Sequence, residues 1–285
     1  MPTQPHPDLP RPRTEEGREG LAALLADPAR AVLALDFDGT LAPIVADPRQ
    51  ARAHPEAVPA LARLAPRLAG IVVITGRPAA DAVRFGGFAG AAGLEGLTVL
   101  GAYGAERWDA GDGTVRAPEP PPGVAAVRAE LPGLLARLGA PEGTWTEDKG
   151  RALAVHTRRA ASPDEALELL RAPLYALAEE HGLMVEPGRM VLELRPPGAD
   201  KGAALTGYVH EKSATAVVYG GDDRGDLPAY DAVAALRAQG TAGLLVYSAP
   251  EAGTETVPAL AERADLTLSG PAGLTGWLHR LADSL

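Results

Sequence analysis

The stretch AVLALDFDGT, residues 31–40, decides the fold of this 285-residue chain. Its first five residues are apolar without a break, which predicts a short strand buried on both faces of a helix-covered parallel sheet. Asp36 and Asp38 follow directly, and Gly39 permits a tight turn after them. Ligands bind beyond the carboxyl ends of the strands in such sheets. The stretch therefore predicts both a fold class and the place of a chemical site.

Short apolar runs and helical stretches alternate through most of the chain. Further apolar runs occupy 70–74, 97–100, 214–219 and 244–247, and helical spacing occurs at 20–26, 55–68 and 228–239. This alternation is typical of parallel sheets with helices on both faces. We therefore predict an α/β fold with a Rossmann-like parallel-sheet core.

The middle of the chain has a different pattern. Residues 152–158 alternate apolar and polar as a half-buried strand does, and residues 163–180 have helix-start signals and helical spacing. Two β-rich runs around Pro187-Gly188 predict an antiparallel hairpin. We predict an inserted α+β cap domain over 107–196, a core formed by 19–106 and 197–285, and a proline-rich disordered tail over 1–18.

Composition excludes several classes of function. The net charge of −10 disfavours a nucleic-acid partner, and the absence of cysteine excludes thiolate chemistry and disulfides. The histidines lack metal-ligand spacing, which disfavours zinc. No apolar run is long enough to cross a membrane, and the N-terminus lacks a signal core, so we expect a cytoplasmic protein. The sequence leaves the oligomeric state open.

Acidic clusters follow two of the predicted strands, at Asp36 to Asp38 and at Asp222 to Asp226. Several carboxylates at one sheet edge repel one another unless a cation lies among them, and Mg²⁺ prefers such an all-oxygen site. We predict as magnesium ligands the side chains of Asp36 and Asp222 and the backbone carbonyl of Asp38. Asp223 and Asp226 are assigned to partial ligation or support.

This edge also has the groups that phosphoryl transfer needs. Asp36 can attack phosphorus to form a phospho-aspartate, and Asp38 can act as acid and then as base. Thr75 follows the second strand and offers a hydroxyl and a backbone N–H to phosphate. Lys201, one of only three lysines in the chain, offers a compact positive charge.

These clusters match the four signature motifs of the haloacid dehalogenase superfamily. The resemblance covers 31–40, 71–77, 200–205 and 217–230, in the order that the superfamily shows. Between Thr75 and Lys201 lie enough residues for a whole domain, whereas Asp38 and Thr75 are separated by one helix and strand. The inserted domain thus resembles the larger cap class found on sugar phosphatases.

The full pattern resembles the trehalose-phosphate phosphatase family. The matching pieces are DFDGTLAPI at 36–44, TGR at 75–77, GAE at 104–106, EDKG at 147–150, HTR at 156–158, VLELRPPGADK at 191–201 and GDDRGD at 221–226. The resemblance implies a magnesium-dependent hydrolysis of trehalose 6-phosphate and a small-molecule sugar phosphate as partner. It also implies that Glu147, Lys149 and Glu193, with Arg158 as a weaker candidate, contact the sugar. Gly76 and Arg77 are expected to bind substrate beside Thr75.

The chain departs from the family at four positions. Ala102 and Tyr103 stand where Asn-His is usual, and Leu227 and Tyr230 stand where Glu and Phe are usual. A phosphatase of another glycosyl phosphate, of the sucrose, glucosylglycerol or mannosylglycerate type, therefore stays open as an alternative.

A non-catalytic sugar-phosphate-binding domain is a second alternative. It is disfavoured because the predicted nucleophile, acid, lysine and metal aspartate are all present. The chain has neither a GxxxxGK[ST] run nor a GxSxG motif, which disfavours nucleotide-binding modules and serine hydrolases.

Overall fold

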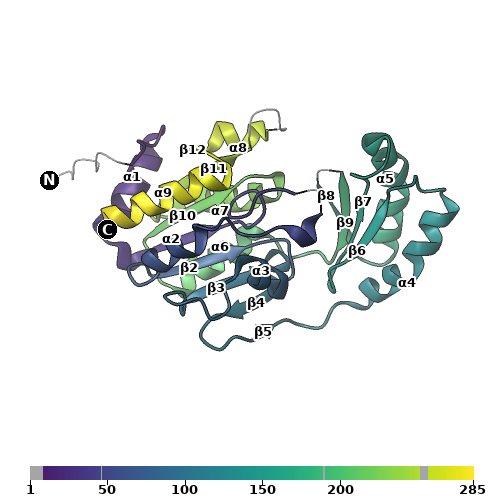
Figure 1. Ribbon diagram of the computed structural model, residues 1–285, viewed down its shortest axis with the longest axis horizontal. Coiled ribbons are helices and arrows are strands. Elements are labelled where there is room, and N and C mark those ends of the chain that lie inside the picture. The colour runs from purple at the N-terminus through teal and green to yellow at the C-terminus, as the bar shows by residue number, and fades with distance from the viewer. Residues whose placement is uncertain (1–8, 46, 189, 251–255) are drawn as a thin grey trace. The chain divides into compact units, whose positions relative to one another are not determined.

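The computed structural model describes residues 9–45, 47–188, 190–250 and 256–285, which form two compact units (Figure 1). The core unit comprises Met1–Ala117 and Asp200–Leu285, and the inserted unit comprises Pro118–Ala199. Within the described ranges, no helix combines the length and the hydropathy that crossing a membrane requires.

The core unit is built on an 8-stranded sheet in the order β12-β11-β10-β1-β2-β3-β4-β5. Its strands are β1 (Ala31–Leu35), β2 (Gly70–Ile74), β3 (Leu97–Gly101), β4 (Glu106–Asp109), β5 (Val115–Arg116), β10 (Ala216–Gly221), β11 (Ala242–Ala249) and β12 (Leu266–Ser269). All neighbours from β12 to β3 pair in parallel, whereas β4 and β5 pair antiparallel. The sequence placed β1 and β2 at their observed bounds, and the predicted α/β class is confirmed.

Helices cover both faces of this sheet, because alternate residues of each buried strand point to opposite sides. Leu33 and Leu35 of β1 pack in one apolar cluster with α1 (Glu15–Ala26), α2 (Ala57–Leu64), α3 (Ala79–Gly86) and α9 (Gly270–Ser284). Val32 and Ala34 pack in the other with α6 (Lys201–Glu211), α7 (Leu227–Ala238) and α8 (Pro258–Arg263). The carboxyl ends of the parallel strands are left to carry polar groups.

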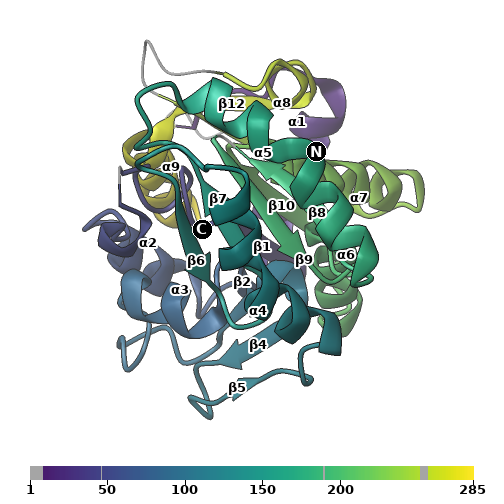
Figure 2. The ribbon, with the colours of Figure 1, turned by 90° about the vertical axis from the view of Figure 1, so that its right-hand side faces the viewer.

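The inserted unit is an antiparallel sheet with two helices. Its sheet order is β6-β7-β9-β8, formed by β6 (Trp145–Asp148), β7 (Leu153–His156), β9 (Val191–Arg195) and β8 (Met184–Gly188). The helices α4 (Pro122–Arg137) and α5 (Pro163–Glu180) lie along one face (Figure 2), where Leu170 and Leu174 join Leu153 and Leu192 in the core. The predicted hairpin is present as β8 and β9.

The inserted unit begins later than the sequence predicted. Residues 107–117 were expected in the cap, but β4 and β5 extend the large sheet of the core unit. Thr98 to Gly101 pair antiparallel with β4, and this hairpin ladder outweighs the loop-like composition of the segment. The strand predicted as half-buried over 152–158 corresponds to β7, and all four residues of β7 are buried. This strand lies between β6 and β9 in the sheet.

The expected disordered tail does not hold for its described part. Residues 1–8 lie outside the described residues, but Leu9 is buried against the core. Arg13 donates to the backbone carbonyls of Glu262 and Ala264 at 2.5 and 2.8 Å. Thr14 caps α1 by accepting from the Gly17 N–H at 3.0 Å. Proline-rich composition misled the prediction because the anchoring partners come from the far end of the chain.

Candidate active site

Parallel pairing brings the two acidic stretches to one edge of the core sheet. Leu35 of β1 is in register with Gly220 of β10, and the Asp36 N–H donates to the Gly220 carbonyl at 2.8 Å. Asp36 thus leaves its strand beside Asp222, although the two residues are 186 positions apart in the chain. The run that predicted the strand therefore also fixes the position of its first carboxylate.

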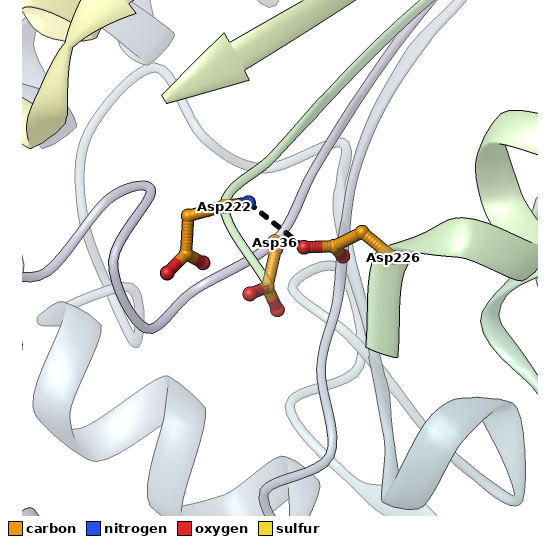
Figure 3. Close-up of side chains that lie close together, drawn as sticks. All are labelled: Asp36, Asp222 and Asp226. Carbon is orange, nitrogen blue, oxygen red and sulfur yellow. Dashed lines mark hydrogen bonds between the residues drawn. The ribbon is translucent and has the colours of Figure 1, made fainter. Parts of the chain in front are cut away.

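Asp36, Asp222 and Asp226 form a compact acidic cluster (Figure 3). One carboxylate oxygen of each lies within 4.8 Å of the others. Burial raises the pKa of Asp36 well above its ordinary value; Lys201 opposes this shift and Asp226 adds to it. Burial and the charges of Asp223 and Asp36 likewise raise the pKa of Asp222. Such crowding of anions is relieved by a bound cation, so Asp36 and Asp222 in this cluster fit a divalent metal.

A tight turn after Asp36 packs against this cluster. Gly39 has a φ of +73°, and a Cβ atom built on it would lie 1.9 Å from Asp222 Oδ2. The buried Ser248 hydroxyl, at the end of β11, donates to the Gly39 carbonyl at 2.8 Å. Only glycine fits here, both for its backbone conformation and for space. Ser248 was not predicted as a site residue, although its position at the end of a strand was a usable signal.

Lys201 contacts two of the three carboxylates of this cluster. Its Nζ lies 2.8 Å from Asp36 Oδ1 and 2.7 Å from Asp226 Oδ1, and all three side chains are almost completely buried. Asp200 caps α6 by accepting from the Ala203 N–H at 2.8 Å, which sets Lys201 at the first helical position. The hydroxyl of Tyr219 also donates to Asp226 Oδ1, at 2.6 Å. Tyr219 could not be singled out from the sequence, since it lies in an apolar strand.

Asp223, assigned from the sequence to partial ligation or support, bonds within its own loop. Its side chain accepts from the Gly225 N–H at 2.8 Å and caps the short turn Arg224–Asp226, while remaining exposed. It is not among the described carboxylates that converge with Asp36, and Asp226 takes that place. The GDxxxD spacing at 221–226 was the signal for Asp226.

The carboxylate of Asp38 is held by Arg77. The guanidinium donates to Asp38 through Nε at 2.5 Å and through an Nη at 2.7 Å. The same guanidinium lies over the rings of Phe37 and Phe85, at 5.7 and 5.1 Å from their centroids. Arg77 therefore fixes the direction in which the Asp38 side chain points.

The Thr75 to Arg77 segment differs in one respect from expectation. The backbone N–H of Thr75 donates to Leu100 of β3 at 3.0 Å, so it is used by the sheet and is not left for phosphate. The Thr75 hydroxyl accepts from the Arg77 N–H at 3.1 Å, and its own proton can be directed to a ligand. A Cβ on Gly76 would meet the Tyr103 ring at 2.8 Å, which explains glycine at this position.

Within the inserted unit, the four residues predicted to contact sugar come from three neighbouring strands and their ends. Cross-strand register puts Glu147 of β6 and Glu193 of β9 on the same face of the sheet, on either side of Ala154. Lys149 lies 2.5 Å from Glu193, and Glu147 Oε2 lies 2.9 Å from the ring of His156. Arg158 follows β7 and is half-buried.

Known proteins resemble this chain along most of its length. The model of the trehalose-phosphatase family matches residues 34–262. A trehalose-phosphate phosphatase of Mycolicibacterium paratuberculosis is 34% identical over 257 residues, which are 88% of this chain. This chain spans 61% of the length of that relative. A probable trehalose-phosphate phosphatase of Sinorhizobium fredii is 33% identical, with 68% of this chain and 69% of the relative covered.

Solved structures share the fold. The C-terminal domain of a C. albicans trehalose-6-phosphate phosphatase aligns with a TM-score of 0.73 at 20% identity, covering 97% of this chain and 99% of that one. A haloacid dehalogenase-like hydrolase of Bacteroides thetaiotaomicron aligns with a TM-score of 0.58 at 17% identity, covering 88% and 99%. The family match and the sequence relatives together show that this chain belongs to the trehalose-phosphatase family.

Proposed function

We propose that this protein is a phosphatase that hydrolyses trehalose 6-phosphate to trehalose and phosphate, with Mg²⁺ and a phospho-aspartate on Asp36. The observation that supports this most is the buried contact between Asp36 and Lys201 at the strand edge, beside Asp222. A nucleophile, a cation that orients it and an acidic metal cluster are the groups that this chemistry requires. The choice of trehalose 6-phosphate is supported by the names of the relatives.

In the proposed reaction, one carboxylate oxygen of Asp36 attacks phosphorus. The bond from phosphorus to the sugar oxygen breaks, and Asp38 gives its proton to that oxygen. Water then attacks the phosphorus of the phospho-aspartate, Asp38 takes the proton from this water, and phosphate leaves as Asp36 is regenerated. Lys201 holds the attacking carboxylate in place through its contact with Asp36 Oδ1.

The carboxylates of Asp36 and Asp222 and the backbone carbonyl of Asp38 would hold Mg²⁺, with Asp223 and Asp226 in support. When bound, this ion neutralises charge on the phosphoryl group and on the carboxylates. Gly76 gives the phosphate close access to the backbone, and the Thr75 hydroxyl donates to a phosphate oxygen. The main role that we assign to Arg77 is to hold Asp38, because its guanidinium donates to that carboxylate.

Discrimination between sugars is assigned to Glu147, Lys149, Glu193 and Arg158 of the inserted unit. The core groups recognise phosphate and cannot distinguish one sugar from another. Carboxylates and an ammonium group that share one sheet face are well suited to sugar hydroxyls. Lys149→Ala and Glu193→Ala should each reduce kcat/KM for trehalose 6-phosphate but leave p-nitrophenyl phosphate hydrolysis nearly unchanged. Equal losses on both substrates would contradict this assignment.

The deciding experiment is phosphate release from trehalose 6-phosphate and from sucrose, glucosylglycerol and mannosylglycerate phosphates, with Mg²⁺ and with EDTA. We expect trehalose 6-phosphate to be preferred, EDTA to stop the reaction, and Asp36→Asn to be inactive but folded. Preference for another glycosyl phosphate would replace the substrate and keep the mechanism. Substantial activity of folded Asp36→Asn would refute the phospho-aspartate.

A further inference from the structure

The carboxylate of Asp226 has its hydrogen-bonding capacity filled by the protein itself. Oδ1 accepts from Lys201 Nζ at 2.7 Å and from the Tyr219 hydroxyl at 2.6 Å. Oδ2 accepts from the backbone N–H groups of Asp222 and Asp223 at 2.8 and 3.0 Å. A carboxylate offers about four lone-pair sites, so four donors leave little for a metal ion. Asp226 is also 0% exposed, which places it behind the reacting edge.

These four bonds tie together parts of the site with different tasks. The two backbone bonds shape the loop that carries Asp222, and a Cβ on Gly221 would collide with Asp226 at 2.4 Å. The bond from Lys201 connects the same carboxylate to the nucleophile, because Lys201 also contacts Asp36. Asp226 thus sets the positions of both the predicted metal ligand and the lysine.

Two carboxylates compete for the ammonium group of Lys201. Asp226 and Asp36 lie at nearly the same distance from Nζ, 2.7 and 2.8 Å, in surroundings that exclude water. A second donor to the same oxygen of Asp226 weakens the hold of Asp226 on the lysine, and the Tyr219 hydroxyl is such a donor. Burial and the charge of Asp226 raise the pKa of Tyr219, so the hydroxyl keeps its proton.

We propose that Tyr219 is a positioning residue for the phosphatase reaction: by donating to Asp226, it leaves Lys201 available to orient Asp36. In this proposal Asp226 holds Lys201 and the loop of Asp222 in place, and the side chains that bind the metal ion are those of Asp36 and Asp222. The inference rests on the proposed function, since it assigns Asp36 as the nucleophile. Without the hydroxyl, Lys201 shifts towards Asp226, and Asp36 loses the contact that aims it at phosphorus.

A neighbouring tyrosine provides a matched control. Tyr230 packs edge-on against Tyr219, with ring centroids 6.1 Å apart, and is equally buried. Its hydroxyl has no hydrogen-bond partner among the described residues. Tyr219→Phe and Tyr230→Phe therefore remove the same atom from the same apolar layer, but only the first removes a bond to the site.

The test compares the two variants with the wild-type full chain on p-nitrophenyl phosphate. Tyr219→Phe should lower kcat roughly tenfold and leave KM nearly unchanged, whereas Tyr230→Phe should leave both unchanged. Urea unfolding at the assay temperature measures the folded fraction, which should stay near that of the wild type. Calorimetric titration with Mg²⁺ should give wild-type affinity for Tyr219→Phe and much weaker binding for Asp222→Asn.

Three results would overturn the proposal: an unchanged kcat in Tyr219→Phe, a loss of kcat that only follows the folded fraction, or an equal loss in Tyr230→Phe. Weakened Mg²⁺ binding in Tyr219→Phe would also contradict it, because the effect would then act through the metal ligands. A different result would refute the proposed function itself: a wild-type protein that releases no phosphate from any ester.

Discussion

The contact between Arg77 and Asp38 predicts how the enzyme should respond to the leaving group. Asp38 must give a proton to the departing oxygen, and Arg77 fixes its carboxylate through bonds of 2.5 and 2.7 Å. An alkoxide needs that proton, whereas p-nitrophenolate leaves readily without it. Arg77→Met, which keeps much of the side-chain bulk, should therefore impair alkyl phosphates more than aryl phosphates.

The structure sets the size of this effect. Hydrogen bonds between charged groups contribute about 1.5–3 kcal/mol each. The Arg77 side chain is only 10% exposed, but that of Asp38 is 31% exposed, so solvent weakens the pair. We take about 2 kcal/mol as the loss of orientation, which corresponds to roughly a thirtyfold fall in kcat/KM for an alkyl phosphate. The fall for p-nitrophenyl phosphate should be only about threefold.

The assay uses glycerol phosphate and p-nitrophenyl phosphate. Neither ester carries the disaccharide, so contacts to the sugar do not affect the comparison between them. The quantity compared is kcat/KM, which for this two-step scheme covers events up to departure of the leaving group. Arg84→Met is the control, since Arg84 also lies over the Phe85 ring, at 4.5 Å, but pairs with Asp81 on the exposed side of α3. Equal losses for the two esters in Arg77→Met would refute the positioning argument.

Three further predictions concern stability. Tyr230→Phe should raise the free energy of unfolding by about 1 kcal/mol, because it removes a buried hydroxyl without a partner; a lower urea midpoint would contradict this. Thr14→Ala should lower it by about 1–2 kcal/mol through loss of the α1 cap and of the bond to Asp265, and an unchanged urea midpoint would show that residues near 14 do not anchor the chain. Arg107 lowers the pKa of Glu211 and of Asp109, so these two ion pairs stabilise the fold above the ordinary carboxylate pKa values and lose their effect as pH falls through the lowered values. The stability difference between wild type and Arg107→Met should therefore shrink from pH 6 towards about pH 3, and a constant difference would exclude the ion pairs as its source.

The presence of buried parallel strands could be predicted because a continuous apolar run is a local pattern. Residues 31–35 and 70–74 are continuous apolar runs, and both are strands with the predicted bounds. The hairpin of β4 and β5 could not be predicted in this way, since its pairing with β3 is not written in the composition of 107–117. The anchoring of residues 9–14 was missed for the same reason, because its partners lie near residue 265.

By itself, the sequence determined which chemical groups reach the active edge: the carboxylates after β1 and β10, the hydroxyl of Thr75 and the ammonium of Lys201. Only the tertiary structure decided what each group bonds to. In the structure, Arg77 donates to Asp38, and the N–H of Thr75 donates to a neighbouring strand of the sheet. Asp226 accepts from four donors, one of which is Tyr219. The physical reason is that a strand end follows from local apolar patterning, whereas a hydrogen bond requires two atoms within about 3 Å. That proximity is set by the register between strands far apart in the chain, and no local pattern encodes it.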